Sequence, residues 1–225
     1  MKILALDAST EALSAALLDD AHVALEHFEI APQGHARLLL PAAQALLETA
    51  GWQLDDLDGL AFGRGPGAFT GLRIAAGLVQ GLAGGLNRPV VPVSTLRALA
   101  ARCMQDNGVG NVRVVQDARM GEVYTADFQR GGHGPVCTAQ ERVIEPGQVS
   151  PWPDTPDWTG AGNGWPLVFA AREQPARQPT EQWPHALDIA RLALPELSAG
   201  LGVAAEMALP VYVRDDVARK SADRK

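Results

Sequence analysis

Residues 3–10 read Ile-Leu-Ala-Leu-Asp-Ala-Ser-Thr, a short apolar run that ends in a polar turn. A run of this length is typical of a buried strand. A second apolar segment, residues 13–18, follows the turn, and residues 23–28 continue the pattern with weaker alternation. The chain is therefore predicted to open with three short strands joined by tight turns.

Helices and strands alternate in the segment that follows this opening, which is typical of an α/β protein. The predicted elements are a helix over residues 35–50, a strand over 57–62, a glycine-rich loop over 63–71, a helix from there to Leu86, a strand over 88–93 and a helix over 94–104. Gly51 is expected to end the first helix and Ser94 to cap the last. Pro41 should kink the first helix or end its first turn.

The opening pattern recurs later in the chain. Residues 114–118 read Val-Val-Gln-Asp-Ala and match residues 4–8, Leu-Ala-Leu-Asp-Ala, at an offset of 110 positions. In both places an apolar strand ends in an Asp-Ala turn and a second strand follows, over residues 123–128 in the later copy. Two short matches can arise by coincidence, whereas a true duplication would give two similar lobes that face each other.

The composition changes between residues 146 and 184, where half of the 16 prolines and four of the five tryptophans lie. This region is predicted to be irregular, apart from a short strand near Trp158. A last helix is expected over residues 187–194, followed by an edge strand over 207–213 that contains Pro210. The tail after Arg214 is expected to be frayed.

These elements divide the chain into two predicted lobes. The N-terminal lobe comprises residues 1–102 and is joined by about 187–225. The second lobe comprises residues 103–186 and includes the irregular region rich in proline and tryptophan.

Composition and charge exclude several classes of protein. Acidic residues outnumber basic ones 26 to 19, so the net charge of −7 makes binding of nucleic acid through bulk charge a poor hypothesis. Cys103 and Cys137 form no zinc-binding or disulfide pattern. The first apolar stretch is too short for a signal-peptide core, and the longest, residues 74–86, is interrupted by Gln80. We therefore expect a soluble, cytoplasmic protein without a membrane anchor.

The glycine-rich loop at residues 63–71 fits no phosphate-binding template well. A Walker A loop needs Lys and Ser or Thr after its last glycine, but Leu72 and Arg73 follow here. A dinucleotide site needs an acidic residue about 20 positions further on, and no Asp or Glu occurs between Gly59 and Gln105. A tight turn between strand and helix is the alternative interpretation.

The same acid-free stretch contains five arginines. They are Arg64, Arg73, Arg88, Arg97 and Arg102. They could be solvated residues on two helices, or they could form a positive patch for an anionic partner surface.

Gly77, Gly81 and Gly85 recur at intervals of four residues and lie on one face of the predicted helix. Each glycine costs about 1 kcal/mol relative to alanine in a helix interior. Such a smooth stripe allows another helix to approach closely. That helix could be the one at residues 35–50 of the same lobe, or it could come from a second chain.

Catalytic patterns are mostly absent from the sequence. The five histidines show no HxxxH or HExxH spacing, and no G-x-S-x-G motif is present. Asp7 and Asp117 are the best candidate carboxylates, because each ends a predicted strand where a metal-phosphate could bind. Either could equally cap its own turn, which is the commoner role.

Several motifs together resemble those of the bacterial TsaB (YeaZ) family. They are residues 3–11, residues 65–73 (Gly-Pro-Gly-Ala-Phe-Thr-Gly-Leu-Arg), residues 92–96, residues 117–124 and the C-terminal run at 210–214. They occur in order and with similar spacing over most of the chain. The region rich in proline and tryptophan is covered least.

The resemblance implies an α/β, actin-like ATPase domain (ASKHA, ribonuclease H-like) fold with two duplicated lobes. It implies a non-catalytic subunit that works with a TsaD-like catalytic paralogue and a TsaE-like ATPase. Together they would transfer threonylcarbamoyl to N6 of adenosine 37 in tRNAs that read codons beginning with A. Contact with tRNA is expected mainly through the complex, and a homodimer of the isolated chain is left open.

The resemblance also assigns site residues. The partner interface is expected at His35, Leu39, Leu46, Arg64, Gly65, Pro66, Gly67, Thr70, Arg73, Gly77, Gly81 and Gly85. A degenerate nucleotide site is expected at Asp7, Ser9, Asp117 and Arg119. Neither a metal nor another cofactor is expected, because Thr95 and Leu99 stand where the catalytic paralogue carries its metal-binding histidines, and Arg119-Met120 replaces its phosphate-binding Gly-Gly turn.

Two enzymatic alternatives remain at this point. One is an ATP-dependent kinase or transferase of the same fold, which would use Asp7 and Asp117 around a metal-nucleotide. The other is a metal-dependent glycoprotease, which the missing histidine pair disfavours.

Overall fold

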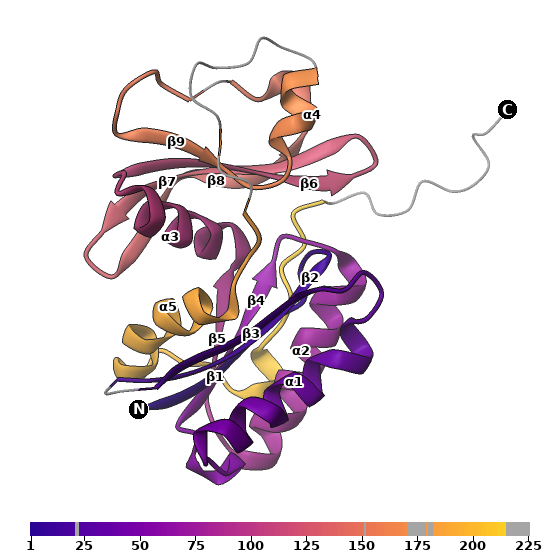
Figure 1. Cartoon of the computed structure of the whole chain (residues 1–225), viewed down its shortest axis with the longest axis vertical. Coiled ribbons are helices and arrows are strands. Elements are labelled where there is room, and N and C mark those ends of the chain that lie inside the picture. Colours follow the sequence, from indigo (N-terminus) through magenta and orange to yellow (C-terminus); the bar gives the residue numbers. More distant parts are fainter. Residues whose placement is uncertain (21–22, 151, 171–178, 180–181, 215–225) are drawn as a thin grey trace, which may run out of the picture.

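The computed structural model describes residues 1–20, 23–150, 152–170, 179 and 182–214. Two lobes, each built around one β-sheet, follow one another along the long axis of the molecule (Figure 1). The tail that was expected to be frayed lies outside the described residues. Within the described ranges, no helix combines the length and the hydropathy that a transmembrane span requires.

The first lobe contains a five-stranded sheet in the order β3-β2-β1-β4-β5. Its strands are β1 (Lys2–Asp7), β2 (Ala12–Asp19), β3 (Ala24–Ile30), β4 (Gly59–Gly65) and β5 (Val90–Ser94). The first three strands form an antiparallel meander, which confirms the predicted opening. β4 runs parallel to β1, and β5 runs parallel to β4.

The second lobe repeats this topology in a four-stranded sheet with the order β8-β7-β6-β9. Its strands are β6 (Asn111–Arg119), β7 (Glu122–Gly131), β8 (Gly134–Ile144) and β9 (Trp158–Ala161). Here too an antiparallel meander is followed by a strand that runs parallel to the first one. The shared strand order indicates that the sequence repeat is a true duplication.

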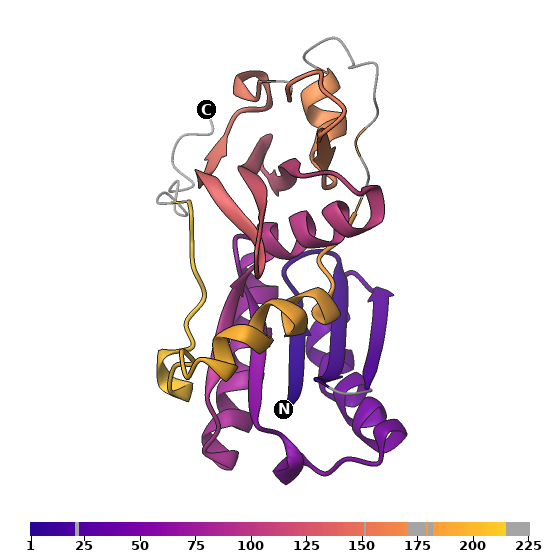
Figure 2. The same ribbon diagram turned by 90° about the vertical axis from the view of Figure 1, so that its left-hand side faces the viewer.

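The described residues form five α-helices. These are α1 (His35–Ala50), α2 (Phe69–Leu86), α3 (Thr95–Asn107), α4 (Trp165–Ala170) and α5 (Ala186–Ser198). Alternate residues of β1 point to opposite faces of the first sheet. Leu4 and Leu6 lie in one apolar core with α1 and α2, whereas Ile3 and Ala5 lie in another with α5. α1 and α2 therefore cover one face of this sheet and α5 covers the other (Figure 2).

Two predicted helix ends are confirmed, and of the two alternatives for Pro41, a kink or an end of the first turn, the second is excluded. Gly51 follows α1 with a left-handed φ of 67°, and the Ser94 hydroxyl accepts the Arg97 amide at 3.1 Å at the start of α3. α1 does not end near Pro41, which is exposed within it. The buried residues of α1 hold the helix against the sheet, which outweighs the missing N–H of the proline.

The expected edge strand at 207–213 is not formed. A 3-10 turn, η3 (Ala205–Met207), occupies its start, and the residues that follow are extended without a ladder. Pro210 has no N–H to donate, and the Val211 amide bonds to the Arg64 carbonyl at 2.7 Å. Instead, Val203 forms an isolated β-bridge with Val90 at the edge of β5.

Two elements were missed by the sequence pattern. β8 is mostly exposed, so it lacks the apolar alternation that reveals half-buried strands. α4 has only six residues and falls in the region that was predicted to be irregular. The strand expected near Trp158 is β9.

The predicted lobe boundary at residue 102 falls inside α3. Leu96, Leu99 and Cys103 lie in the apolar core of the second sheet, together with Val112 and Val114. One side of α3 therefore packs in the second lobe, while Ala98 lies in a core of the first sheet, so the helix joins the two lobes. Additional 3-10 turns, η1 (Leu54–Asp56) and η2 (Pro146–Gln148), lie in loops.

Candidate functional site

The glycine-rich loop leads from the carboxyl end of β4 into α2. A Cβ at Gly71 would collide with the Ala8 carbonyl oxygen, and one at Gly67 would collide with the Ser9 carbonyl oxygen. The Ala68 amide donates to the same Ser9 oxygen at 2.7 Å. The glycines let this loop touch the backbone of the turn after β1, so the tight-turn interpretation accounts for them.

Asp7, at the end of β1, is buried next to this loop. One carboxylate oxygen accepts the Ser9 amide at 3.1 Å and the Ser9 hydroxyl at 2.9 Å. The other oxygen, Oδ1, has no hydrogen-bond partner, and a side chain at Gly63 would collide with it. Burial raises the pKa of Asp7 to about 7, although the two bonds from Ser9 act in the opposite direction.

The corresponding turn of the second lobe connects β6 to β7. The Arg119 amide donates to Asp117 Oδ1 at 2.7 Å, and the Asp117 amide donates to Asn163 Oδ1 at 2.9 Å. Arg119 and Met120 adopt left-handed φ values of 62° and 58°. Non-glycine residues rarely adopt this conformation, and their clustering often marks a functional site.

A cavity of about 300 Å³ lies between the two turns. Its lining includes the turn after β1, the start of α2, the end of β6 and residues 211–214. Of the four residues assigned to a degenerate nucleotide site, Ser9, Asp117 and Arg119 line this cavity, whereas Asp7 is not among its lining residues. Arg119 forms ion pairs with Asp117 and with Glu11 of the first lobe. Both carboxylates that could hold a metal-nucleotide here are therefore ion-paired with the same arginine, whose single charge offsets one of the two.

Thr95 and Leu99, the positions at which the resemblance implies metal-binding histidines in a catalytic paralogue, contribute to the fold of this chain. The Thr95 hydroxyl donates to the Pro66 carbonyl at 2.6 Å, and Leu99 is buried in the second core. Among the described residues, no three His, Cys, Asp or Glu side chains are grouped so that they could hold a metal ion.

The outer surface of α2 brings together five residues that were assigned to a partner interface. Gly77, Gly81 and Gly85 are exposed, and a Cβ at any of them would have no neighbour within 4 Å. Thr70 and Arg73 are exposed on the same helix. The stripe therefore does not pack against α1, which removes the intramolecular alternative. We call this surface, together with the exposed Phe69, the α2 face.

Other predicted interface residues are placed elsewhere. Leu39 and Leu46 are only 1% and 9% exposed and lie in the first core, so this chain uses them for its own packing, and their assignment to an interface stays a prediction. Gly65 and Pro66 are buried as well. His35 is half-buried, and its Nε2 lies 3.3 Å from the Ala12 carbonyl oxygen.

The acid-free stretch does not produce a free positive patch. Arg64 lies 3.9 Å from Glu141 of β8, Arg97 forms an ion pair with Glu196 at 2.8 Å, and Arg102 does so with Asp188 at 2.7 Å. Arg88 donates to the Asp55 carbonyl at 3.2 Å. Acidic side chains from distant parts of the chain thus pair with Arg64, Arg97 and Arg102, whereas Arg88 bonds to a backbone carbonyl.

Arg73 differs from the other four arginines. Its guanidinium lies 3.9 Å from the centre of the Phe69 ring, and its Nε donates to the Tyr212 hydroxyl at 3.1 Å. The two aromatic rings are themselves 5.3 Å apart. This exposed cluster was not expected from the sequence beyond Arg73, because Tyr212 was assigned to a strand.

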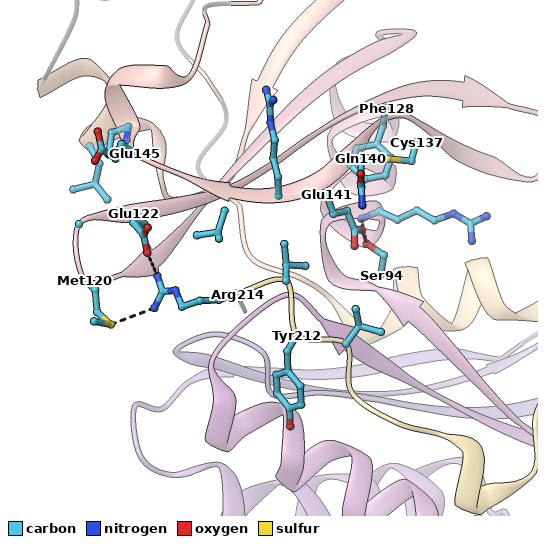
Figure 3. A pocket seen from close by; sticks show the side chains of 18 of the residues that line it. Ser94, Met120, Glu122, Phe128, Cys137, Gln140, Glu141, Glu145, Tyr212 and Arg214 are labelled. Carbon is cyan, nitrogen blue, oxygen red and sulfur yellow. Dashed lines mark hydrogen bonds and ion pairs between the residues drawn. The ribbon is translucent and has the colours of Figure 1, made fainter. Parts of the chain in front are cut away.

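A larger groove of about 1390 Å³ lies on the other side of residues 211–214 (Figure 3). Glu141, Cys137 and Arg97 line it from β8 and α3, and Arg214 lines it from the C-terminal segment. Burial raises the pKa of the Cys137 thiol, whose Sγ donates to the Ala139 carbonyl at 2.8 Å. No sequence motif had singled out this groove.

Comparisons with known proteins agree with this arrangement. The family model described as "TsaD: tRNA N6-adenosine threonylcarbamoyltransferase" matches residues 27–167. The Escherichia coli (strain K12) protein named "tRNA threonylcarbamoyladenosine biosynthesis protein TsaB" is 40% identical over 226 residues, which is 98% of this chain and 97% of that protein. The protein of the same name from Haemophilus influenzae is 34% identical over 231 residues, 98% of this chain and 96% of that one.

A solved structure, "YeaZ from Pseudomonas aeruginosa", superposes with a TM-score of 0.87 at 46% identity, over 94% of this chain and 99% of that chain. Together with the family match and the two sheets of equivalent strand order, it confirms the predicted α/β, actin-like fold with two duplicated lobes. The chain belongs to the TsaB (YeaZ) family.

Proposed function

We propose that this chain acts in the biosynthesis of threonylcarbamoyladenosine in tRNA, the process for which its Escherichia coli and Haemophilus influenzae relatives are named. Its role is that of a non-catalytic subunit. It supports a TsaD-like catalytic paralogue and a TsaE-like ATPase in the transfer of threonylcarbamoyl to N6 of adenosine 37. Contact with tRNA then occurs mainly through the complex.

The chemistry of the inter-lobe site supports the non-catalytic role. Thr95 and Leu99 offer no imidazole, and Asp7 is buried away from the cavity. Arg119 forms ion pairs with the carboxylates of both Glu11 and Asp117 that line it, and offsets one of their two charges. A metal-nucleotide would have to displace these pairs before it could be held between the lobes.

The single observation that carries the subunit role is the open glycine stripe of the α2 face. Each glycine costs about 1 kcal/mol in a helix, yet nothing within this chain approaches Gly77, Gly81 or Gly85. A stripe without side chains allows the axis of a partner helix to come close. A TsaD-like paralogue or a second copy of this chain could supply that helix.

Reconstitution tests the proposal. The chain, its TsaD-like and TsaE-like partners, an activated threonylcarbamoyl donor, ATP and unmodified tRNA are combined, and the modified nucleoside is measured with each protein omitted in turn. Omission of this chain is expected to abolish modification, while the isolated chain turns over no ATP above background. Undiminished modification without the chain, or transfer by the chain alone, would contradict the proposal.

A further inference from the structure

Residues 211–214 cross from the first lobe to the second, and we call them the strap. In both overall views the chain runs from η3, beside α2, up to the second sheet (Figures 1 and 2). At the first lobe, the Val211 amide donates to the Arg64 carbonyl at 2.7 Å, and the Tyr212 hydroxyl accepts from Arg73 at 3.1 Å. This end of the strap is therefore attached to the loop after β4 and to α2.

The other end of the strap is attached to the second lobe. Val213 packs against the second apolar core. Arg214 donates from Nη2 to Glu122 Oε2 at 2.5 Å and to the Ala118 carbonyl at 3.2 Å, and Nη1 lies 3.2 Å from the Met120 sulfur (Figure 3). Its side chain is only 16% exposed. Arg214 therefore attaches the strap to the strained turn between β6 and β7.

The strap separates two cavities. All four of its residues line both the inter-lobe cavity of about 300 Å³ and the groove of about 1390 Å³. Ser9 and Gln116 lie on the side of the small cavity, whereas Glu141 and Cys137 lie on the side of the groove. Movement of this short segment would join the two spaces into one cleft.

One buried polar side chain behind the strap lacks a hydrogen-bond partner in the closed arrangement. Gln116, a lining residue of the small cavity, is 2% exposed, and its Oε1 has no hydrogen-bond partner. Buried polar atoms normally find a partner, and this one would find water in an open cleft. The contacts of the strap stabilise the closed state against that opposing tendency.

We propose that the strap is a latch, a segment that the contacts of Arg214 hold in the closed position. Release of the latch opens the inter-lobe cavity to solutes from the groove. The device needs no large rotation of the lobes, because only four residues separate the two spaces. Ordered and released states of such a segment are a common form of conformational switch. The inference concerns the isolated chain and does not depend on the proposed function.

The test measures access to the small cavity with a cysteine at its wall. The variant Gln116→Cys is made in a Cys137→Ser background, where the remaining cysteine, Cys103, is buried. The rate of alkylation by iodoacetamide is compared with Arg214 intact and with Arg214→Ala. The latch predicts an increase of at least tenfold. Arg142→Ala, which removes an exposed arginine lining the same groove, is the matched control and should leave the rate unchanged.

Two further measurements separate the latch from general destabilisation. Hydrogen exchange of the Val211 amide should accelerate in Arg214→Ala, while core amides of β1 and β6 keep their protection. A chain that ends at Pro210 should react at least as fast as Arg214→Ala; if it does not fold, the Arg214→Ala results decide. Unchanged alkylation and Val211 exchange, or acceleration shared by the core amides, would overturn the proposal.

Discussion

Glu11 and Arg119 form an ion pair that joins the turn after β1 to the turn after β6, one from each lobe. Arg119 also holds Asp117 of its own turn, at 3.1 Å. An ion pair therefore joins the two duplicated turns, at the place where the sequence predicted a degenerate nucleotide site. The exposure of each partner decides how strong this link is.

We expect the Glu11–Arg119 pair to contribute little to stability. The Arg119 side chain is 65% exposed, so solvent screens the pair, and exposed pairs contribute about 0–1 kcal/mol. A double-mutant cycle with Glu11→Gln and Arg119→Gln, measured by urea unfolding, should give a coupling energy below about 1 kcal/mol. Coupling above about 2 kcal/mol would show instead that this pair is a principal tie between the lobes.

Asp7 should make the protein less stable as the pH rises toward neutrality. Its pKa is about 7 in the folded chain and near 3.8 when unfolded. Between these values the folded state binds the extra proton, so the free energy of unfolding falls with rising pH and becomes level above about 7. The total decrease is on the order of 4 kcal/mol at most. Asp7→Asn should remove this slope in urea unfolding measured from pH 4 to pH 8.

Ser9→Ala tests whether the Ser9 hydroxyl lowers the pKa of Asp7. Loss of the hydroxyl bond at 2.9 Å removes one interaction that favours the charged carboxylate. The pKa of Asp7, followed by carboxyl-carbon NMR, should then rise further. A carboxyl that titrates near 4 in the wild-type chain would contradict the assignment.

Gly81→Leu should leave the chain folded and abolish its association with the TsaD-like paralogue. A Cβ at Gly81 has no neighbour within 4 Å, and leucine has a higher helix propensity than glycine, which is roughly 0.8–1 kcal/mol less favourable than alanine. The melting temperature should therefore stay equal or increase. Gly132→Leu, at an exposed glycine of the second lobe, serves as control for an added surface leucine. Normal association of Gly81→Leu in light scattering would remove the α2 face as the interface.

Arg64 and Arg73 should differ in their effects on association. Arg73 is exposed beside Phe69 and Tyr212, so Arg73→Ala should weaken binding of the partner by about tenfold, or 1.4 kcal/mol. Arg64 faces Glu141 between the lobes, so Arg64→Ala should leave the dissociation constant unchanged. Titration calorimetry of both variants distinguishes the two sites. Equal losses of affinity in the two variants would indicate instead that both arginines belong to one partner-binding patch.

The sequence predicted what depends on local periodicity. Residues 3–6 alternate between two apolar cores, and Val114 and Val115 do so in the second lobe, so the strands could be read from the sequence, whereas the short repeat left the duplication open until the strand order of the two sheets was known. The glycine stripe was likewise visible from spacing alone. Its surroundings were not, because Gly71 touches backbone and Gly81 touches nothing, although both are glycines of one helix.

The rest of the site depends on contacts between distant residues. Leu39 and Leu46 follow a helical spacing that serves equally for a core or for an interface, and they are in the core. Arg214 meets Glu122 across 92 positions, and Tyr212 meets Arg73 across 139. No local pattern encodes such pairs. The strap was therefore taken for an ordinary edge strand.

The opposite pH dependence is expected of Glu26, which anchors the start of α5 to the first sheet. Its carboxylate accepts the Ser14 hydroxyl and the Leu187 amide at 3.0 Å each, and His185 Nδ1 lies 2.9 Å from it. Burial disfavours the charge, but the contacts with His185 and Leu187 outweigh it and leave the pKa of Glu26 below its usual value.

Because the folded pKa of Glu26 is lowered, its contribution to stability is complete above the unfolded pKa of about 4.5 and is lost as the pH falls through the folded value. Glu26→Gln should therefore be less stable than the wild type at pH 7, and the difference should shrink below pH 4.5. Loss of one partner of such a half-buried charged network costs roughly 1–3 kcal/mol. Glu29→Gln, an exposed residue of the same strand, is the control. A deficit that persists undiminished at low pH would show that the shape of the side chain, not its charge, holds α5 in place.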